Sequence, residues 1–507
     1  STVVWNSRNA INLGIDPGLP TPFANGNLLV EIPVTTYAGT VSFNGVNYSV
    51  TNAQQLAAYN DVLVAAVANG TLTSQQAYNE SFSKAFSTRL EPVVYKTNTT
   101  DGDFTRIPNG DRYAVLAQGT RGSATIASGA QIDIERASGA VKAANGATVT
   151  NNGTLSGNVV QQVVRVESGS RFTNSATGVV SSGYLSGDKL NTATATPFYY
   201  TGSGITATDA GSTVQNSGVI NTAGFAFLNN SSTGMSLGNG AAGNNNGNIN
   251  VGVNPDFVTT VIGVDVYGGS SFTNAANGTI YIGRAAQYSL ADPSVDVSTN
   301  APSYGVRINN FGDSATNAGR IVIGSKSQNA VAMYSTAPQS SLLLNTGTID
   351  INGAASGTPL ANIGILADDN GAAGTGAIAR NAGTINVNGI NGVGIKVNAN
   401  PGAQANAEST GVINVNGNAD PASGTRNFGV WVDGPGAVAN VSGAINLSGK
   451  GAIGAFAQDG GTINIAAGAD PKFLAGSDQI GYFASGANSK INVAATTMAV
   501  NTDRSTL

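Results

Sequence analysis

The feature that most constrains the fold is a short run of alternating apolar and polar residues, bounded by Gly or Asn, that recurs through most of the chain. Two examples are Ile445 to Leu447 and Gly461 to Ile465. Alternation over so few residues indicates a strand with one buried face. Such a strand cannot bury that face by itself, so copies must stack on one another. The repeat therefore predicts a solenoid.

Each copy divides into three strands, and many copies open with Gly-Thr-Ile or Gly-Val-Ile. Gly and Asn at the corners tolerate the positive φ that tight turns need. We expect an all-β, right-handed parallel β-helix over residues 111–507, with roughly 16 to 18 rungs about 4.8 Å apart. The first strand reads Ile-x-Ile/Val, at Ile349 to Ile351, Ile385 to Val387, Ile413 to Val415, Ile463 to Ile465 and Ile491 to Val493. The second reads apolar-Gly-apolar-x-apolar, at Ile262 to Val266, Tyr304 to Ile308, Val393 to Val397 and Phe428 to Val432. The third is small or polar, at Ser271 to Asn274, Ser314 to Asn317, Ala377 to Arg380 and Ala437 to Asn440.

Residues 1–110 depart from the repeat and form a separate N-terminal region. Its start is rich in loops, with Trp5 and three prolines before residue 23. Asn44-Gly45 lies between two alternating runs and predicts a β-hairpin. A helical hairpin is predicted near 52–88, and it either caps the rod or presents a partner-binding knob. Its first helix follows a cap at Thr51 or Asn52, carries Leu56, Tyr59, Leu63 and Ala66, and stops at Asn69-Gly70. Its second follows Thr73 or Ser74 and carries Ala77, Tyr78, Phe82 and Phe86.

Composition excludes several classes of site. The chain has no His and no Cys, so Ser-His-Asp and Cys-His catalysis, disulfides and most zinc sites are excluded. Its net charge of −5 argues against general nucleic-acid binding. No apolar run reaches the roughly 18 residues of a membrane helix. We expect no cofactor and no bound metal, and no polar cap is evident at Thr506-Leu507.

The outward residues of the second strand form a file along the rod, which we expect to be the ligand-binding stripe. A file running from charged to aromatic residues is typical of surfaces that bind sugars or protein. Alternatively, the aromatic members stabilise the last rungs under a loop, and the charged pair at its start is an ordinary surface ion pair. In rung order the file is Asp265, Arg307, Ala332, Leu366, Lys396, Trp431, Phe456 and Phe483.

Two further surfaces are candidates. The outward residues of the first strand are mostly amides, which form a structural ladder or a flat face for contact between rods: Asn250, Tyr281, Asp350, Asn386, Asn414, Asn446, Asn464 and Asn492. The loops between the first and second strands should form one ridge along the rod, and its Asp residues could attract Ca²⁺ or a basic partner. Alternatively, these Asp residues only stabilise the local turns in which they stand. These residues are Asp256, Asp292, Asp420 and Asp470.

The cleanest copy of the repeat, Asn381 to Val387 followed by Gly394 to Val397, resembles the passenger domains of bacterial autotransporter (type V secreted) adhesins. The resemblance covers about residues 111–495 and implies a pectin-lyase-like β-helix of three-stranded rungs. It also implies secretion through the outer membrane, folding outside, and display at the cell surface on a C-terminal β-barrel that would follow Leu507. Members of that family contribute to adhesion, aggregation, biofilm formation and virulence.

The sequence thus predicts a non-enzymatic cell-surface adhesin. Its partner would be a host matrix protein, a host glycan, or an identical passenger on a neighbouring cell. The acidic net charge disfavours a heparin-like polyanion unless Arg165, Lys189, Arg307 and Lys396 converge. The alternative is a polysaccharide lyase or glycoside hydrolase on the same scaffold, which would need paired carboxylates. A third possibility is a purely structural spacer.

Overall fold

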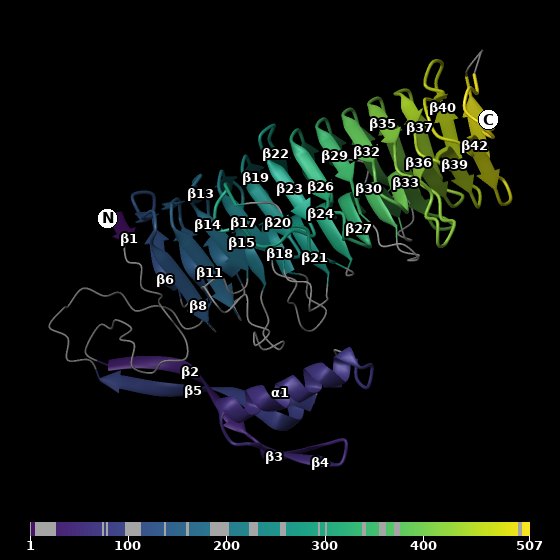
Figure 1. Ribbon diagram of the computed structural model, residues 1–507. Coiled ribbons are helices and arrows are strands. Elements are labelled where there is room, and N and C mark those ends of the chain that lie inside the picture. Colours follow the sequence, from purple (N-terminus) through teal and green to yellow (C-terminus); the bar gives the residue numbers. More distant parts are fainter. Residues whose placement is uncertain are drawn as a thin grey trace.

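The computed structural model shows the right-handed parallel β-helix that the repeat predicts (Figure 1). It describes residues 2–5, 27–73, 76–77, 80–96, 113–135, 138–158, 162–182, 202–222, 232–253, 260–292, 295–299, 302–336, 341–353, 361–369, 376–494 and 499–507. Three long parallel sheets hold the successive strands of each rung. We call them sheets I, II and III, and they contain 12, 13 and 14 strands.

The strands of each sheet follow one another at intervals of three along the chain. Sheet I contains β8 (Gln131–Glu135), β11 (Thr154–Asn158), β14 (Val179–Ser182), β17 (Val219–Thr222), β20 (Asn248–Val251), β23 (Thr279–Ile282), β26 (Arg320–Ile323), β29 (Thr348–Ile351), β32 (Thr384–Val387), β35 (Val412–Val415), β38 (Ile445–Leu447) and β41 (Pro471–Phe473). Sheet II contains β6 (Tyr113–Gln118), β9 (Gly139–Ala144), β12 (Gln162–Val166), β15 (Ser203–Thr208), β18 (Ser232–Gly238), β21 (Val261–Val266), β24 (Ser303–Ile308), β27 (Ala330–Ser335), β30 (Asn362–Asp369), β33 (Gly392–Ala399), β36 (Phe428–Asp433), β39 (Ile453–Gln458) and β42 (Ile480–Ser485). Sheet III contains β1 (Thr2–Trp5), β7 (Ser123–Ile126), β10 (Thr148–Asn151), β13 (Arg171–Asn174), β16 (Thr213–Asn216), β19 (Ala242–Asn245), β22 (Ser271–Asn274), β25 (Ser314–Asn317), β28 (Leu342–Asn345), β31 (Ala377–Asn381), β34 (Ala405–Ser409), β37 (Ala437–Val441), β40 (Thr462–Ile465) and β43 (Lys490–Val493).

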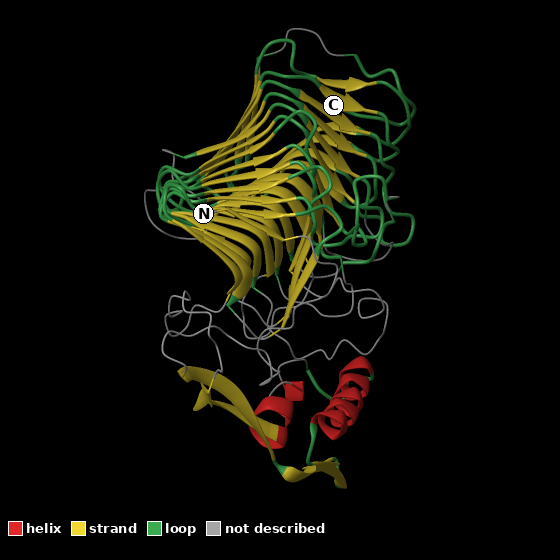
Figure 2. Ribbon diagram, turned by 90° about the vertical axis from the view of Figure 1, so that its left-hand side faces the viewer, coloured by secondary structure: helices red, strands yellow, loops and turns green. Residues whose placement is uncertain are grey.

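The inward residues of the three sheets form one continuous core. In β32, Ile385 and Val387 are fully buried while Thr384 and Asn386 point outward, as the period of two requires. The same core extends from Val115 to Phe473. Figure 2 looks along the stack, where the strands of successive rungs lie one above another. Equivalent side chains therefore form files along the rod.

The Gly that opens many copies is required by close approach between rungs. At Gly383, an added Cβ would lie against the carbonyl oxygen of Gly347, and at Gly411 against that of Gly383. No side chain fits between backbones this close. The repeated Gly therefore sets the stacking of the corner before sheet I.

Two strand assignments made from the sequence are wrong. Ile463 to Ile465 and Ile491 to Val493 belong to β40 and β43 of sheet III and not to sheet I. Near the C-terminus the third strand takes the same Ile-Asn-Ile/Val pattern as the first, so local sequence cannot separate them. Within the described residues the three sheets contain 12 to 14 strands each, fewer than the predicted 16 to 18 rungs.

A buried asparagine ladder runs inside the rod at the end of the sheet III strands, and the sequence analysis did not predict it. From Asn151 to Asn345 each Nδ2 donates to the Asn Oδ1 of the next rung at 2.7–2.9 Å, Asn381 ends the series by donating to Ser409 Oγ, and every member is fully buried. The ladder satisfies polar side chains that would be costly to bury unpaired. Its members are Asn151, Asn174, Asn216, Asn245, Asn274, Asn317, Asn345 and Asn381.

The N-terminal region contains the predicted hairpin and first helix. Strands β3 (Gly39–Phe43) and β4 (Val46–Val50) pair across Asn44-Gly45, both of which have positive φ. Helix α1 (Ala53–Ala68) is capped by Asn52, whose side chain accepts a hydrogen bond from the Gln55 N–H. Tyr59 and Leu63 of α1 are buried in a small separate core. None of the helices in the described residues is long and apolar enough to cross a membrane.

The second predicted helix is only partly present. Residues 76–77 are helical and η2 (Glu80–Ala85) is a π-helical turn, but Phe86 begins a strand. That strand, β5 (Phe86–Lys96), pairs antiparallel with β2 (Asn27–Tyr37), a ribbon that the sequence analysis missed. Tyr78 and the three N-terminal prolines lie outside the described residues. Strand β1, which contains Trp5, pairs with β7 at the edge of sheet III. Whether the N-terminal unit caps the rod stays a prediction.

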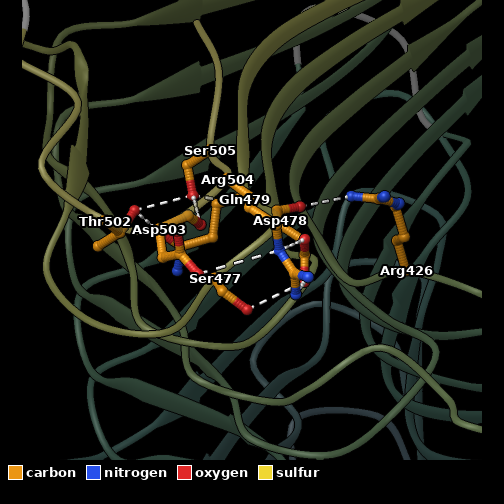
Figure 3. Close-up of polar contacts among 8 residues, drawn as sticks. All are labelled: Arg426, Ser477, Asp478, Gln479, Thr502, Asp503, Arg504 and Ser505. Carbon is orange, nitrogen blue, oxygen red and sulfur yellow. Dashed lines mark hydrogen bonds and ion pairs between the residues drawn. The ribbon is translucent and has the colours of Figure 1, made fainter.

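At the C-terminus, a polar network joins the last described residues to sheet II, although no polar cap was expected there. Residues Ile480 and Thr506 form a parallel bridge. Arg504 contacts both oxygens of the Asp478 carboxylate at 2.9 Å, and Arg426 donates to the Asp478 carbonyl (Figure 3). Hydrogen bonding by Ser477, and then by Arg504, holds the pKa of Asp478 below its usual value. This network covers the edge of β42.

Candidate functional site

The predicted stripe exists on the outer face of sheet II, with one member misplaced. The register joins Asp265 to Arg307, Leu366 to Lys396, Lys396 to Trp431, and Trp431 through Phe456 to Phe483. Between Arg307 and Leu366, however, stands Tyr334. Ala332 is fully buried and takes the place of the Gly found in the neighbouring strands of sheet II, Gly305 in β24 and Gly364 in β30. Without that Gly as a landmark, the sequence pattern was misaligned by two residues.

Asp265 and Arg307 form the ion pair that the sequence suggested. The Nε and Nη2 of Arg307 each donate to one carboxylate oxygen at 2.9 Å, and Asn309 Nδ2 donates to Asp265 Oδ1 at 3.0 Å. Burial alone would lower the pKa of Arg307, but the hydrogen bond and charge of Asp265 raise it. These hydrogen bonds hold the two side chains on the face of sheet II, and their role in ligand binding stays a prediction.

A tyrosine pair occupies the next position on the file. The rings of Tyr304 and Tyr334 stack with centroids 4.9 Å apart. The hydroxyl of Tyr334 donates to Asp368 Oδ2 at 3.2 Å. Burial, and then the charge of Asp368, raise the pKa of Tyr334. The aromatic part of the stripe therefore begins earlier than expected.

Lys396 occupies the middle of the stripe with its ammonium near an aromatic face. Its Nζ lies 4.3 Å from the centre of the Trp431 ring. Burial lowers the pKa of Lys396, while the charges of Asp433 and Asp368 act in the opposite direction. Within the described residues, no hydrogen bond or ion pair engages this ammonium. A partly desolvated ammonium that contacts an aromatic face but has no hydrogen bond or ion pair is unusual, and it marks this part of the stripe.

The C-terminal part of the stripe is a stack of aromatic rings. Phe456 is only 8% exposed because Phe428, Trp431 and Phe483 contact it, with centroids 5.5, 5.5 and 5.1 Å away. Phe483 at the end is 43% exposed. These rings support one another by mutual contact, and they present an apolar edge at the last rungs.

Two files beside the stripe were missed by the sequence analysis. One is apolar and contains Tyr304, Val331, Ile363, Val393 and Phe428 in register, forming with Leu366 a cluster separate from the rod core. The other is polar and contains Asp368, Asn398, Asp433 and Gln458. Both files could have been found from the sequence. The apolar residues stand three positions before the stripe residue of the same strand, and the polar residues stand two positions after it.

The polar file contains a carboxyl group with an altered pKa. Burial raises the pKa of Asp433, the charge of Lys396 lowers it, and that of Asp459 raises it, with a net increase. Asp433 and Asp368 stand two rungs apart with Asn398 between them. Lys396 thus lies near two carboxylates, those of Asp368 and Asp433.

The loop ridge of Asp residues is not a single site. Asp292 accepts hydrogen bonds from the N–H groups of Tyr288 and Ser289, which hold its pKa below the usual value. Asp420 accepts from Ser423 at 2.6 Å, and Asp470 accepts from Tyr482 at 2.7 Å. Asp470 follows β40 of sheet III and so emerges from a different corner, whereas Asp256 lies outside the described residues. Among the described residues, no group of three or more acidic side chains could hold a metal ion.

The outward amides form two ladders instead of one. On sheet I, Asn446, Asn414 and Asn386 donate in sequence toward Asp350, each at 2.8 Å. On sheet III, Asn492 and Asn464 donate in the same way toward Asn440. Asn250 donates to Asn221 of the preceding rung and also to Gln287, whereas Tyr281 donates to Asp296; Gln287 and Asp296 lie in the segment that follows β23.

Among the described basic residues, Arg165 does not converge with Arg307. Four register steps separate Arg165 from Arg307, and Arg165 pairs with Glu167. Lys189 lies outside the described residues.

Comparisons of the chain with protein-family models, with curated proteins and with solved structures find no match.

Proposed function

We propose that this chain is the passenger of a cell-surface adhesin and that sheet II carries its ligand-binding face. The observation that supports the proposal is the continuous outward file from Asp265 to Phe483, flanked by an apolar file and a polar file. Stacked rungs repeat every 4.8 Å or so, and they hold these side chains on a rigid surface. An extended surface of this kind suits an extended ligand.

The partner we propose is a host matrix protein, a host glycan, or an identical passenger on a neighbouring cell. The amide ladder on sheet I offers a flat polar surface for the homotypic case, because each amide retains hydrogen-bonding capacity after its ladder bond. The location we propose is the bacterial cell surface, anchored at the outer membrane. Adhesion, aggregation and biofilm formation follow from such a location.

The test is to display the chain on a non-adherent bacterial strain and to score settling, binding to immobilised matrix proteins, and binding to a glycan array. Cells that carry the same display system without this chain are the control. We expect at least one of the three readouts to rise above that control. If none rises, the adhesin proposal is wrong.

A second candidate function is glycoside hydrolysis or polysaccharide lysis, and the pair Asp368 and Asp433 favours it. Residues two rungs apart are separated by roughly 9–10 Å, near the upper end of the carboxylate spacing of inverting glycosidases, about 6.5–9.5 Å. The raised pKa of Asp433 suits an acid. Reducing-end release and unsaturated-product absorbance, measured on a set of polysaccharides, would detect it, and Asp433→Asn should abolish any such activity.

A further inference from the structure

Two buried polar groups without hydrogen-bond partners lie beside a lysine ammonium on two adjacent rungs of sheet II. Lys396 Nζ lies 4.3 Å from the centre of the Trp431 ring and forms no hydrogen bond or ion pair among the described residues. Trp431 Nε1 and Asn398 Oδ1 are both buried without a hydrogen-bond partner. The register places Trp431 beside Lys396, and Asp433 beside Asn398. Leaving a buried donor or acceptor unpaired costs about 1–3 kcal/mol each. Two buried orphan groups beside an ammonium that has no hydrogen bond or ion pair point to a ligand that would satisfy them.

The surroundings limit the chemistry of that ligand. The groups Lys396 Nζ and Trp431 Nε1 are donors, whereas Asn398 Oδ1 is an acceptor. Two carboxylates in the adjacent polar file, Asp368 and Asp433, accept as well. A hydroxyl group both donates and accepts, so a ligand with several hydroxyls can bond to all of them. The rings of Phe428 and Trp431, which are partly exposed and pack against each other, supply an apolar surface beside these groups.

Charge selects between neutral and anionic ligands. The charges of Asp368, Asp433 and Asp459 act on this patch against one ammonium, that of Lys396. A carboxylated or sulfated sugar would place a further negative charge among these carboxylates, which is unfavourable at close range. A neutral sugar carries no such penalty.

We propose that Lys396, Asn398, Trp431 and Asp433 form a binding site for a neutral glycan whose sugar rings pack on the aromatic stack. The inference rests on the adhesin proposal and specifies its ligand class and site. Because Trp431 Nε1 and Asn398 Oδ1 are covered in the unliganded chain, binding includes a side-chain rotation that brings them to the ligand. Lys396 then gains a hydroxyl partner.

The test uses the full chain and an array of neutral and anionic oligosaccharides, with the best binder measured by titration. The chain has two tryptophans, Trp5 and Trp431, so a Trp5→Phe variant reports on Trp431 alone by fluorescence. We expect neutral oligosaccharides to bind and to change this fluorescence. Lys396→Met and Trp431→Phe should each weaken binding at least about tenfold, which corresponds to 1.4 kcal/mol.

The matched control is Arg380→Ala. Arg380 is 44% exposed and pairs with Glu408 on sheet III, away from the stripe, so its loss should leave affinity unchanged. Thermal unfolding of each variant verifies the fold. Binding to a neutral ligand should change little with salt, because no net charge is recognised.

Several outcomes overturn this inference. They are binding only to anionic oligosaccharides, neutral binding that the two stripe variants do not affect, and no binding to any oligosaccharide. In each case the adhesin proposal can still stand, because cell settling or adhesion to matrix protein is measured independently. Loss of those two readouts as well as glycan binding would remove both proposals.

Discussion

The Nζ of Lys396 lies 4.3 Å from the centre of the Trp431 ring on the next rung of sheet II. This contact holds a partly buried ammonium on an aromatic face, and the aliphatic stem of the lysine covers part of that surface. The stripe residues of neighbouring rungs therefore stabilise one another through their side chains.

Removal of that contact should be measurable. We expect Lys396→Ala to lower the free energy of unfolding by about 1 kcal/mol, because the cation–π contact and the stem packing are both lost. Lys396→Met keeps the stem and should lose less. Thermal denaturation of the two variants provides the comparison. An alanine variant as stable as the parent would show that the contact contributes nothing.

The Asp265–Arg307 pair should behave as a structural unit. Arg307→Met leaves the Asp265 carboxylate, 15% exposed, without its bidentate partner, and we expect a loss of about 2 kcal/mol. The double variant Arg307→Met with Asp265→Leu should recover part of that loss, because no unpaired charge remains. A double-mutant cycle on denaturation midpoints measures the coupling. Additive effects would contradict the expected pairing.

The buried asparagine ladder should contribute more than the outward ladder. Asn274→Ala removes the bonds to Asn245 and Asn317 inside the rod, and we expect a loss of about 2–3 kcal/mol. Asn414→Ala removes two bonds of the same kind on the partly exposed surface and should cost about 1 kcal/mol or less, because water replaces them. Amide hydrogen exchange, measured on the rungs that flank each substitution, compares the destabilisation in the two variants. Equal protection in Asn274→Ala and Asn414→Ala would contradict the expected difference in stability.

Close stacking should make the opening Gly intolerant of substitution. Gly383→Ala forces a Cβ against the Gly347 carbonyl, and we expect a cost of about 2–3 kcal/mol from overpacking. The control, Gly402→Ala, has open space around its Cβ and a φ of +90°, so its cost is conformational strain alone, about 1 kcal/mol. Urea denaturation of both proteins ranks the two effects. The reverse order would count against the close-packed corner.

Alkaline pH should weaken the fold around Tyr281. Burial, and then the hydrogen bond to Asp296, raise the pKa of Tyr281 from 10.0 to about 12. Above pH 10 the unfolded chain therefore loses this proton before the folded chain does. The stabilisation from this group is complete below pH 10 and is lost as the pH rises toward about 12. Tyr281→Phe should remove one late step from the phenolate absorbance titration. An unchanged titration would contradict this assignment.

The amino-acid sequence alone predicted the strands, their inward and outward faces, and most of the stripe. The alternation of apolar and polar residues is a local property of the chain, and so is the placement of Gly or Asn at the corners. It is enough to predict that Ile385 points inward and Asn386 points outward, with no knowledge of contacts between rungs. The helix carrying Tyr59 and Leu63 was predicted for the same reason, since its cap and its spacing are local.

Only the tertiary structure decided which strand stacks on which, because stacking joins residues about 30 positions apart across loops of variable length. In the tertiary structure Ile463 to Ile465 belong to sheet III, and Tyr334 occupies the stripe position that was predicted for Ala332. Asp470 lies at a different corner of the rod from Asp420. The tertiary structure also brought the buried asparagines into one ladder, left Asn398 Oδ1 and Trp431 Nε1 without hydrogen-bond partners, and placed Lys396 Nζ against the Trp431 ring. Such relationships depend on register between rungs, and register is fixed by the packing of the whole core and not by any single repeat.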